Sequence, residues 1–427
     1  MRNSNSSRYD LSRRLLPWFS LALCAGLAMA GCKSENETNA GTSGGTTPAT
    51  SGATKNTSNP TSTGGDKIVV GEYGSLTGDQ ADFGTQTHEG IQLAVDEVNA
   101  AGGIERDGKK FQIQLEKEDD QSKAAQAETA VKRLIDEKNV TAILGEVASS
   151  NSLAGGKVCQ EKGVPMISPS STNITVTKDR DYVFRICFLD SYQSAVVARF
   201  AYDKLKAKRI AVFTNKSEAY SVGFSDEFKK AFIRYGGQIA AEATYSPSDQ
   251  DFRSQLTALK ASNPDAILIP GYYKDAGTIA RQARELNIKI PLLGGDGWSA
   301  PNLVTIGGDA VNDCYFSDHM SIKDPKPVVQ NFVTSYKDKY KKEPTSMAAL
   351  GYDAAKILFA AMKASKTLEK KDIRDAIAQT KNFDGVTGNI TINAERNADK
   401  SAVIIKVVNK AFEYAATVPD PEKPLAP

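Results

Sequence analysis

Residues 67–103 decide the fold class of this 427-residue chain and read KIVVGEYGSLTGDQADFGTQTHEGIQLAVDEVNAAGG. The apolar run Lys67–Gly71 predicts a buried strand, and a glycine-rich loop follows it. A helix comes next and ends at Gly102–Gly103. One face of this helix carries the apolar residues Ile91, Ala94, Val95 and Val98. Strand, loop and helix in this order form the first half of a βαβ unit.

The same alternation continues along the chain. Further strands are predicted at 111–115, 140–144 and 164–168, with a helix capped by Ser122 and another at 151–162 between them. After Asp190 the pattern restarts, with helices predicted at 193–206, 224–235, 252–261 and 276–286 and strands at 210–214, 238–245, 265–269 and 290–293. Two such runs predict an α/β fold with two Rossmann-like lobes built on parallel sheets. A ligand is expected in the cleft between them, at the carboxyl ends of the strands.

The first 31 residues have the pattern of a secretory signal peptide, with a basic start, an apolar run at 15–30 and small residues before Cys32. This pattern resembles a bacterial lipoprotein signal, although Met29 stands where such signals usually carry Leu. The resemblance implies a lipid on Cys32 and a mature protein tied to a membrane outside the cytoplasm. An uncleaved transmembrane helix is the alternative, but the apolar run is shorter than the roughly 20 residues that span a bilayer.

Residues 32–66 are predicted to be a flexible Ser/Thr/Gly-rich tether with a reach of roughly 30–35 Å. Removing residues 1–31 takes away four Arg and one Asp, which leaves 49 basic and 50 acidic residues. A net charge of −1 gives no reason to expect nucleic-acid binding. Three cysteines, Cys159, Cys187 and Cys314, lie far apart in the sequence. One disulfide with a free thiol and three buried thiols are both open.

Catalytic and metal-binding motifs are absent from the sequence. The only two histidines, His88 and His319, belong to no motif, and no G-x-S-x-G, H-E-x-x-H or Walker loop occurs. We therefore expect neither an enzyme, nor a metal, nor a cofactor.

Eight short motifs follow one another in a characteristic order: Gly74-Ser-Leu-Thr-Gly78, Phe83-Gly84, Leu144-Gly-Glu-Val-Ala-Ser149-Ser150, Met166-Ile-Ser-Pro-Ser-Ser-Thr172-Asn173, Val183-Phe-Arg185, Gly271-Tyr-Tyr273, Gly294-Gly-Asp296-Gly297 and Gly351-Tyr-Asp-Ala354. In order and spacing they resemble the leucine/isoleucine/valine-binding protein family, the type 1 periplasmic solute receptors of ABC importers. The resemblance covers nearly all of 67–415 and implies two lobes that are joined by three crossover strands and close like a flytrap. Lobe 1 would comprise 67–190 and 320–395. Lobe 2 would comprise 191–319 and 396–427, with a strand near 401–408.

The resemblance also implies a set of ligand-binding residues. The carboxylate of an amino acid would meet Ser149 and Ser150 and a second polar loop, Ser170, Ser171 and Thr172. Its ammonium would meet Tyr272 and Asp296, where Asp replaces the Glu of some members. Phe83 and Tyr220 would be the aromatic rims.

Physical reasoning supports part of this set. The N-terminus of a helix that opens at Ser149–Ser150 attracts an anion, and Asp296 in a glycine-rich turn can reach into the cleft. Each residue also has a purely structural alternative: capping a helix, turning the chain or packing.

Together these features predict an extracytoplasmic receptor of an ABC importer that binds an α-amino acid, an aliphatic or branched-chain one favoured. Its partners would be the amino acid, the permease subunits in the membrane and the membrane itself through Cys32, and we expect a monomer. The alternatives are a sensory ligand-binding module and a receptor for another small carboxylate or amide.

Overall fold

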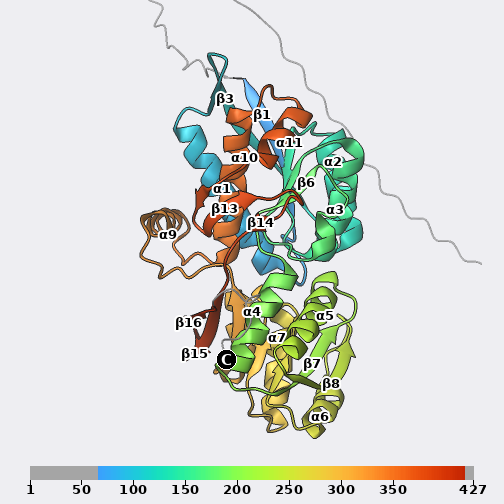
Figure 1. Cartoon of the computed structure of the whole chain (residues 1–427). Helices are drawn as coiled ribbons and strands as arrows, with labels where there is room; N and C mark the ends of the chain where they lie inside the picture. Colours follow the sequence, from blue (N-terminus) through green and yellow to red (C-terminus); the bar gives the residue numbers. More distant parts are fainter. Residues whose placement is uncertain (1–65, 419–427) are drawn as a thin grey trace, which may run out of the picture. The chain divides into compact units, whose positions relative to one another are not determined.

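Two largely parallel sheets with helices on both faces organise residues 66–418, the part of the chain that the computed structural model describes (Figure 1). The first sheet has six strands in the order β2-β3-β1-β4-β5-β6, and only β2 runs antiparallel to its neighbour. These strands are β1 (Lys67–Gly74), β2 (Ile104–Arg106), β3 (Lys109–Asp119), β4 (Ala142–Leu144), β5 (Met166–Ser168) and β6 (Val183–Arg185). We call this sheet and the helices around it lobe 1.

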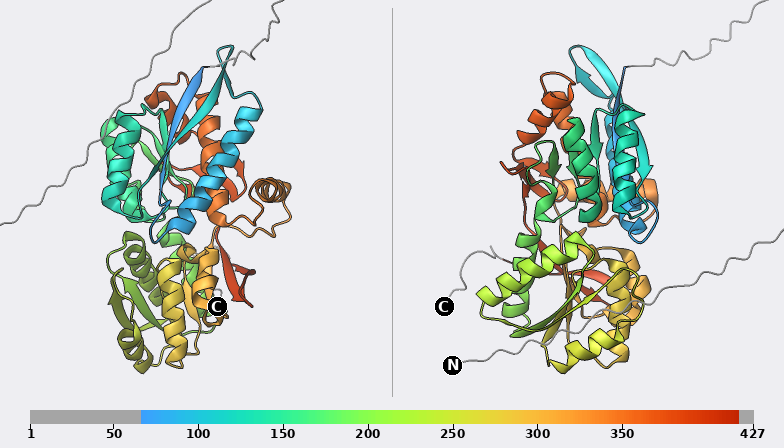
Figure 2. Two further views of the ribbon diagram at one scale, coloured as in Figure 1. Left: turned by 180° about the vertical axis from the view of Figure 1, so that it is seen from behind. Right: turned by 90° about the vertical axis from the view of Figure 1, so that its right-hand side faces the viewer.

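Helices of lobe 1 form two pairs, one on each face of the sheet (Figure 2). On one face α1 (Ala81–Ala100) packs against α10 (Ser346–Ala364), and on the other α2 (Ala124–Asp136) packs against α3 (Ser149–Lys162). The backbones of α1 and α10 touch at two glycines. A Cβ on Gly90 would lie 1.9 Å from the carbonyl oxygen of Ala348, and one on Gly351 would lie 2.4 Å from that of Thr87. Glycine is therefore required at both positions.

Lobe 1 is completed by segments from late in the sequence. Helix α11 (Lys370–Ala378) contacts α10. A small antiparallel sheet follows, made of β12 (Phe383–Gly385), β13 (Gly388–Ile392) and β14 (Ala398–Asp399). Helix α9 (Pro327–Tyr340) buries Val329 and Phe332 in one apolar cluster with Leu93 of α1.

The second sheet has seven strands in the order β16-β15-β11-β10-β9-β7-β8 and forms lobe 2. The strands are β7 (Arg209–Asn215), β8 (Gln238–Tyr245), β9 (Ala266–Leu268), β10 (Leu292–Gly294), β11 (Tyr315–Asp318), β15 (Val403–Val408) and β16 (Ala411–Thr417). Its helices are α4 (Asp190–Asp203), α5 (Ala219–Arg234), α6 (Arg253–Ala261), α7 (Tyr273–Glu285) and α8 (Pro301–Gly307). The last two strands run antiparallel and form a hairpin.

The chain passes between the two sheets three times, after β6, after β11 and after β14. The predicted α/β fold with two lobes and three crossovers is thereby confirmed.

Local predictions were less accurate. Helix α5 begins at Ala219, five residues before the predicted start. Ser122 is not a helix cap, because Lys123 precedes α2 and the hydroxyl of Ser122 is bound to the loop of residues 77–80.

Two findings concern the open questions from the sequence. The thiols of Cys159, Cys187 and Cys314 are free and buried, which favours the second of the two alternatives. Between residues 66 and 418, none of the helices has the length and apolar character needed to cross a membrane. The predicted signal peptide, Cys32 and nearly all of the tether lie outside the described residues.

Candidate functional site

A cavity of about 210 Å³ lies between the two lobes. Lobe 1 supplies Phe83, Val147, Ser149, Ser170, Thr172 and Met347, and lobe 2 supplies Tyr220, Tyr272, Asp296 and Gly297. Only about 10 Å³ of this space admits the centre of a water molecule, which is room for about one water. The walls must therefore move apart to admit a larger ligand between the lobes.

The polar residues of the cavity share one structural position: each follows a parallel strand and stands at or near the start of the next helix. Ser149 begins α3 after β4, Ser170 and Thr172 follow β5, Tyr220 lies in the first turn of α5 after β7, Tyr272 precedes α7 after β9, and Asp296 begins a 3-10 turn (Asp296–Trp298) after β10. The carboxyl ends of parallel strands converge on one edge of each sheet. Residues far apart in the sequence thus face a common space.

Asp296 forms the acidic end of the cavity and is 3% exposed. Its Oδ1 accepts a hydrogen bond from Nε2 of Gln193 at 3.0 Å, and its Oδ2 lies 3.0 Å from Nε2 of His319. The backbone N–H of Gly297 donates to the hydroxyl of Tyr220 at 3.2 Å. The side-chain hydrogen-bond partners of this buried carboxylate are an amide and a histidine, without Lys or Arg, so the carboxylate is suited to receive a cation.

Two tyrosines and a phenylalanine line the wall next to this acid. The rings of Tyr220 and Tyr272 are stacked, with centroids 5.3 Å apart and an angle of 21° between planes. Phe83 meets Tyr272 edge to face at 6.0 Å. Burial, followed by nearby acids, raises the pKa of both tyrosines well above the ordinary value, so their hydroxyls stay protonated.

Two hydroxyls in the cavity lack a hydrogen-bond partner. The Oγ of Ser170 and the Oη of Tyr272 are buried and unpaired. A buried polar group without a partner costs about 1–3 kcal/mol. Such groups at the surface of a cavity indicate atoms that a polar ligand would satisfy. Lobe 1, which supplies Ser170, also supplies Ser149. This serine stands in the first turn of α3, where unpaired backbone N–H groups favour an anion.

Asp190 stands directly behind the cavity. It begins α4, and its Oδ1 accepts a hydrogen bond from Gln193 at 3.0 Å. Burial, with a smaller contribution from the nearby Asp296, raises the pKa of this carboxyl to about 7, against hydrogen bonds from Thr172 and Gln193 that lower it. Gln193 therefore links two buried acids.

Two of the predicted residues do not line the cavity. The hydroxyl of Ser150 donates to Oε2 of Glu218 at 2.9 Å and accepts from the N–H of Ala219 at 3.1 Å, which joins the two lobes at the rim. The hydroxyl of Ser171 points into lobe 1 and contacts the carbonyls of Glu146 and Val147. Both hydroxyls are engaged within the protein.

Other contacts also join the lobes across the cleft. The side-chain amide of Asn173 donates to the carbonyl of Ala219 at 2.7 Å, and the N–H of Asp82 donates to the hydroxyl of Tyr273 at 3.3 Å. An ion pair joins Lys274 to Asp79. The lobes are therefore in contact around the cavity.

Sequence reasoning missed five residues of this site. Val147 and Met347 supply apolar wall, Gly297 supplies backbone, and Gln193 and His319 hold Asp296. Val147 and Gly297 lie inside the quoted motifs, so they could have been found. Nothing in the sequence distinguishes Met347 or Gln193 from ordinary helix residues.

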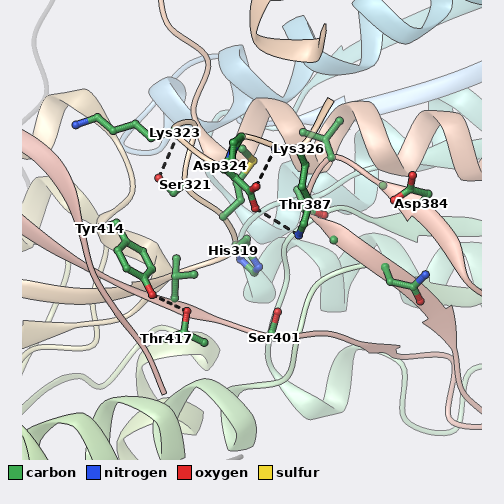
Figure 3. Close-up of a pocket in the computed structure, with 17 residues that line it drawn as sticks. His319, Ser321, Lys323, Asp324, Lys326, Asp384, Thr387, Ser401, Tyr414 and Thr417 are labelled. Carbon is green, nitrogen blue, oxygen red and sulfur yellow. Dashed lines mark hydrogen bonds and ion pairs between the residues drawn. The ribbon is translucent and has the colours of Figure 1, made fainter. Parts of the chain in front are cut away.

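A larger groove, with about 1340 Å³ of empty space, lies on the crossovers rather than between the facing strand ends (Figure 3). It is bounded by the segment from His319 to Lys326, the turn at 384–389 and the hairpin of β15 and β16. Its polar side chains contact one another: Lys326 pairs with Asp324 at 3.4 Å, and Tyr414 bonds to Thr417 at 2.9 Å. Over residues 66–418 no group of three or more His, Cys, Asp or Glu side chains could hold a metal ion.

Comparisons with known proteins agree with this geometry. A leucine-binding protein from Thermotoga maritima is 40% identical, with a TM-score of 0.79 over 83% of this chain and 99% of that one. A branched-chain amino acid transporter substrate-binding protein from Streptococcus pneumoniae, solved with isoleucine, is 35% identical, with a TM-score of 0.78 and the same coverage. An amino acid binding protein from Pseudomonas aeruginosa is 31% identical over 62% of this chain and 71% of its own length. Residues 67–411 match the family described as periplasmic binding protein, and the chain belongs to that family.

Proposed function

We propose that this protein is the solute-binding receptor of an ABC importer and that it captures an α-amino acid with an aliphatic, preferably branched, side chain. The observation that carries the proposal is the small cavity with a buried acid on lobe 2, the unpaired hydroxyl of Tyr272 on the wall next to that acid, and the unpaired hydroxyl of Ser170 on lobe 1. A zwitterion offers a cation and an anion at matching ends. The isoleucine-bound and leucine-binding relatives support the same ligand class.

Membership of the family establishes the general class of protein to which this chain belongs. Periplasmic binding proteins of this family act outside the cytoplasm and serve transporters, so the chain is an extracytoplasmic binding protein and not an enzyme.

Each end of the ligand has its own set of proposed contacts. The ammonium would lie beside Asp296 and the hydroxyls of Tyr220 and Tyr272. The carboxylate would meet Ser149, Ser170 and Thr172 and the N-terminus of α3. The side chain would pack on Phe83, Val147 and Met347. Asp296 is one methylene shorter than a Glu, which leaves more of the cavity to the ligand.

A comparison of ligands tests this orientation. Calorimetry with the purified protein should show binding of leucine, isoleucine or valine, and native mass spectrometry should identify any ligand that copurifies. Leucine methyl ester should bind at least tenfold more weakly than leucine, about 1.4 kcal/mol, because the anion is lost while the side chain and ammonium remain. Equal binding of acid and ester would contradict the proposed carboxylate contacts.

We further propose that lobe 1, residues 67–189 with 320–399, and lobe 2, residues 190–319 with 400–418, move as two rigid bodies about the three crossovers. A ligand that touches both lobes binds the closed form better, and it can shift the equilibrium only by that difference in affinity. Small-angle scattering should therefore give a smaller radius of gyration with saturating ligand. An unchanged radius would contradict closure by the ligand.

Finally, we propose that a lipid on Cys32 anchors the monomeric protein and that residues 33–66 tether it within reach of the permease. Mass spectrometry of the mature protein should find a lipid-modified Cys32 at the N-terminus. Cys32→Ala should release the protein from membranes, and retention of this variant on the membrane would contradict the anchor.

A further inference from the structure

We propose that His319 is a positioning residue for the ligand-binding acid, and that its imidazole must be neutral for a ligand ammonium to bind. This inference rests on the proposed function, because it concerns the same cavity. It adds a residue that touches no ligand. This residue sets the net charge of its pair with Asp296, and Asp296 is the residue proposed to contact the ligand.

The contacts of His319 fit a neutral ring. Its side chain is fully buried, its Nε2 lies 3.0 Å from Oδ2 of Asp296, and its Nδ1 has no hydrogen-bond partner. A neutral ring with its proton on Nε2 donates to Asp296 and leaves only a lone pair unpaired. A protonated ring would also leave a buried Nδ1–H without an acceptor, which costs more.

The ring is held in place by its neighbours. It stacks on Phe188 with centroids 3.9 Å apart and an angle of 17° between planes. Phe188 follows β6 on the first crossover, whereas His319 follows β11 on the second. The hydrogen bond to Asp296 therefore originates where two crossovers meet, at the inner side of the groove on the crossovers (Figure 3).

The charged and titratable groups around His319 come from several elements. Asp296 faces its Nε2, Asp318 accepts a hydrogen bond from its backbone N–H at 2.7 Å, and Asp190 is linked to Asp296 through Gln193. Lys323, Asp324 and Lys326 line the groove on the other side. Tyr220 and Tyr272 lie near Asp296, and the buried Lys400 lies near Asp318. Among the described titratable groups, only His319 lies within hydrogen-bond distance of a carboxylate oxygen of Asp296.

A competition follows from this arrangement. If His319 carries a proton, Asp296 is already paired with a cation, and a ligand ammonium meets a neutral pair instead of an anion. Ligand binding would then require that the proton leave His319. The affinity should therefore fall as the pH is lowered and His319 takes up a proton. The ammonium and the carboxylate of free leucine keep their charges between about pH 5.5 and about pH 8.

Calorimetry at two pH values tests the inference with a matched control in the same chain. The wild type should bind leucine at least tenfold more weakly at about pH 5.5 than at about pH 8. His319→Gln keeps an N–H donor near the position of Nε2 but does not titrate, so its affinities at the two pH values should agree within about threefold. His88→Gln replaces the only other histidine, which pairs with Glu72 in lobe 1, and should behave like the wild type.

A second measurement needs no variant. Calorimetry of the wild type in buffers with different ionisation enthalpies counts the protons exchanged on binding. Near pH 6 leucine binding should release a proton, up to about one per ligand, and near pH 8.5 it should release essentially none.

Several outcomes would overturn the inference. One is a wild type that binds leucine equally at both pH values without releasing protons. Another is His319→Gln retaining the tenfold loss, and if Asp190→Asn then abolishes that loss, Asp190 is the titrating group. Absence of binding of leucine, isoleucine and valine at both pH values would instead overturn the proposed function and this inference with it.

Discussion

The cavity between the lobes and the groove on the crossovers differ in a way that volume does not capture. The groove encloses about 1340 Å³ of empty space and the cavity about 210 Å³. In the groove, ion pairs and hydrogen bonds such as Lys326–Asp324 and Tyr414–Thr417 join the exposed side chains, and none of the described hydroxyls that line it is buried and unpaired. In the cavity, the hydroxyls of Ser170 and Tyr272 are buried and unpaired.

Buried hydroxyls without partners therefore indicate a ligand site better than empty space does. An exposed side chain can turn to water, so a wide groove costs little when it is empty. A hydroxyl that is sealed between two lobes has no such alternative. A bound molecule that forms hydrogen bonds with the hydroxyls of the cavity would therefore lower the free energy of the protein.

Replacing the buried acid should have the largest effect. Asp296→Asn keeps the shape but removes the charge that faces the ligand ammonium, so leucine affinity measured by calorimetry should fall at least tenfold, about 1.4 kcal/mol. Asp324→Asn in the groove is the matched control and should leave affinity unchanged. Equal affinity of Asp296→Asn and the wild type would mean that the ligand carries no cation at this end.

Removing one unpaired hydroxyl should have a smaller effect. Tyr272→Phe keeps the stacked ring but deletes the free Oη, which should lower leucine affinity about fivefold, near 1 kcal/mol. The variant should also be slightly more stable without ligand, because the unpaired group is gone, and thermal melts with and without leucine measure both effects. Full affinity in this variant would place the ligand away from Tyr272.

Changes in the groove should have the smallest effect. Tyr414→Ala and Lys326→Ala alter exposed side chains whose contacts lie within the groove, so leucine affinity should stay within about twofold of the wild type. A larger loss in either variant, with an unchanged melting temperature, would show that the groove communicates with the cavity.

Much of the fold could be predicted from the sequence because local patterns determine it. Alternating strands and helices up to residue 293 are marked by apolar periodicity, and some of them end at glycine, as α3 does at Gly163. The fold of the chain after residue 293 was harder to predict. The pairing of α10 with α1 and the return of β15 to the second sheet depend on contacts between distant segments, and the start of α5 at Ala219 depends on the contacts of Ser150 and Asn173 across the cleft.

Some residues of the site could likewise be predicted from local sequence patterns, and others could not. Ser149 and Ser150 are neighbours in the sequence, but successive helical residues point about 100° apart, so one faces the cavity and the other the rim. Periodicity alone does not reveal which of the two faces the ligand. Gln193 and His319 contact Asp296 only because three segments that are far apart in the sequence lie together in the fold, and no local sequence pattern predicts such a contact.

The close packing of α1 on α10 has a consequence for the order of events during synthesis. The two helices meet at Gly90 and Gly351, and residues 101–345 separate them in the sequence. At about 5–20 residues per second, the apolar face of α1 waits roughly 12–50 s for its partner to emerge from the ribosome. Lobe 1 cannot complete its core from its own first segment. The leading part of the chain therefore remains incompletely folded until synthesis is almost finished, which leaves time for an export machinery to engage it.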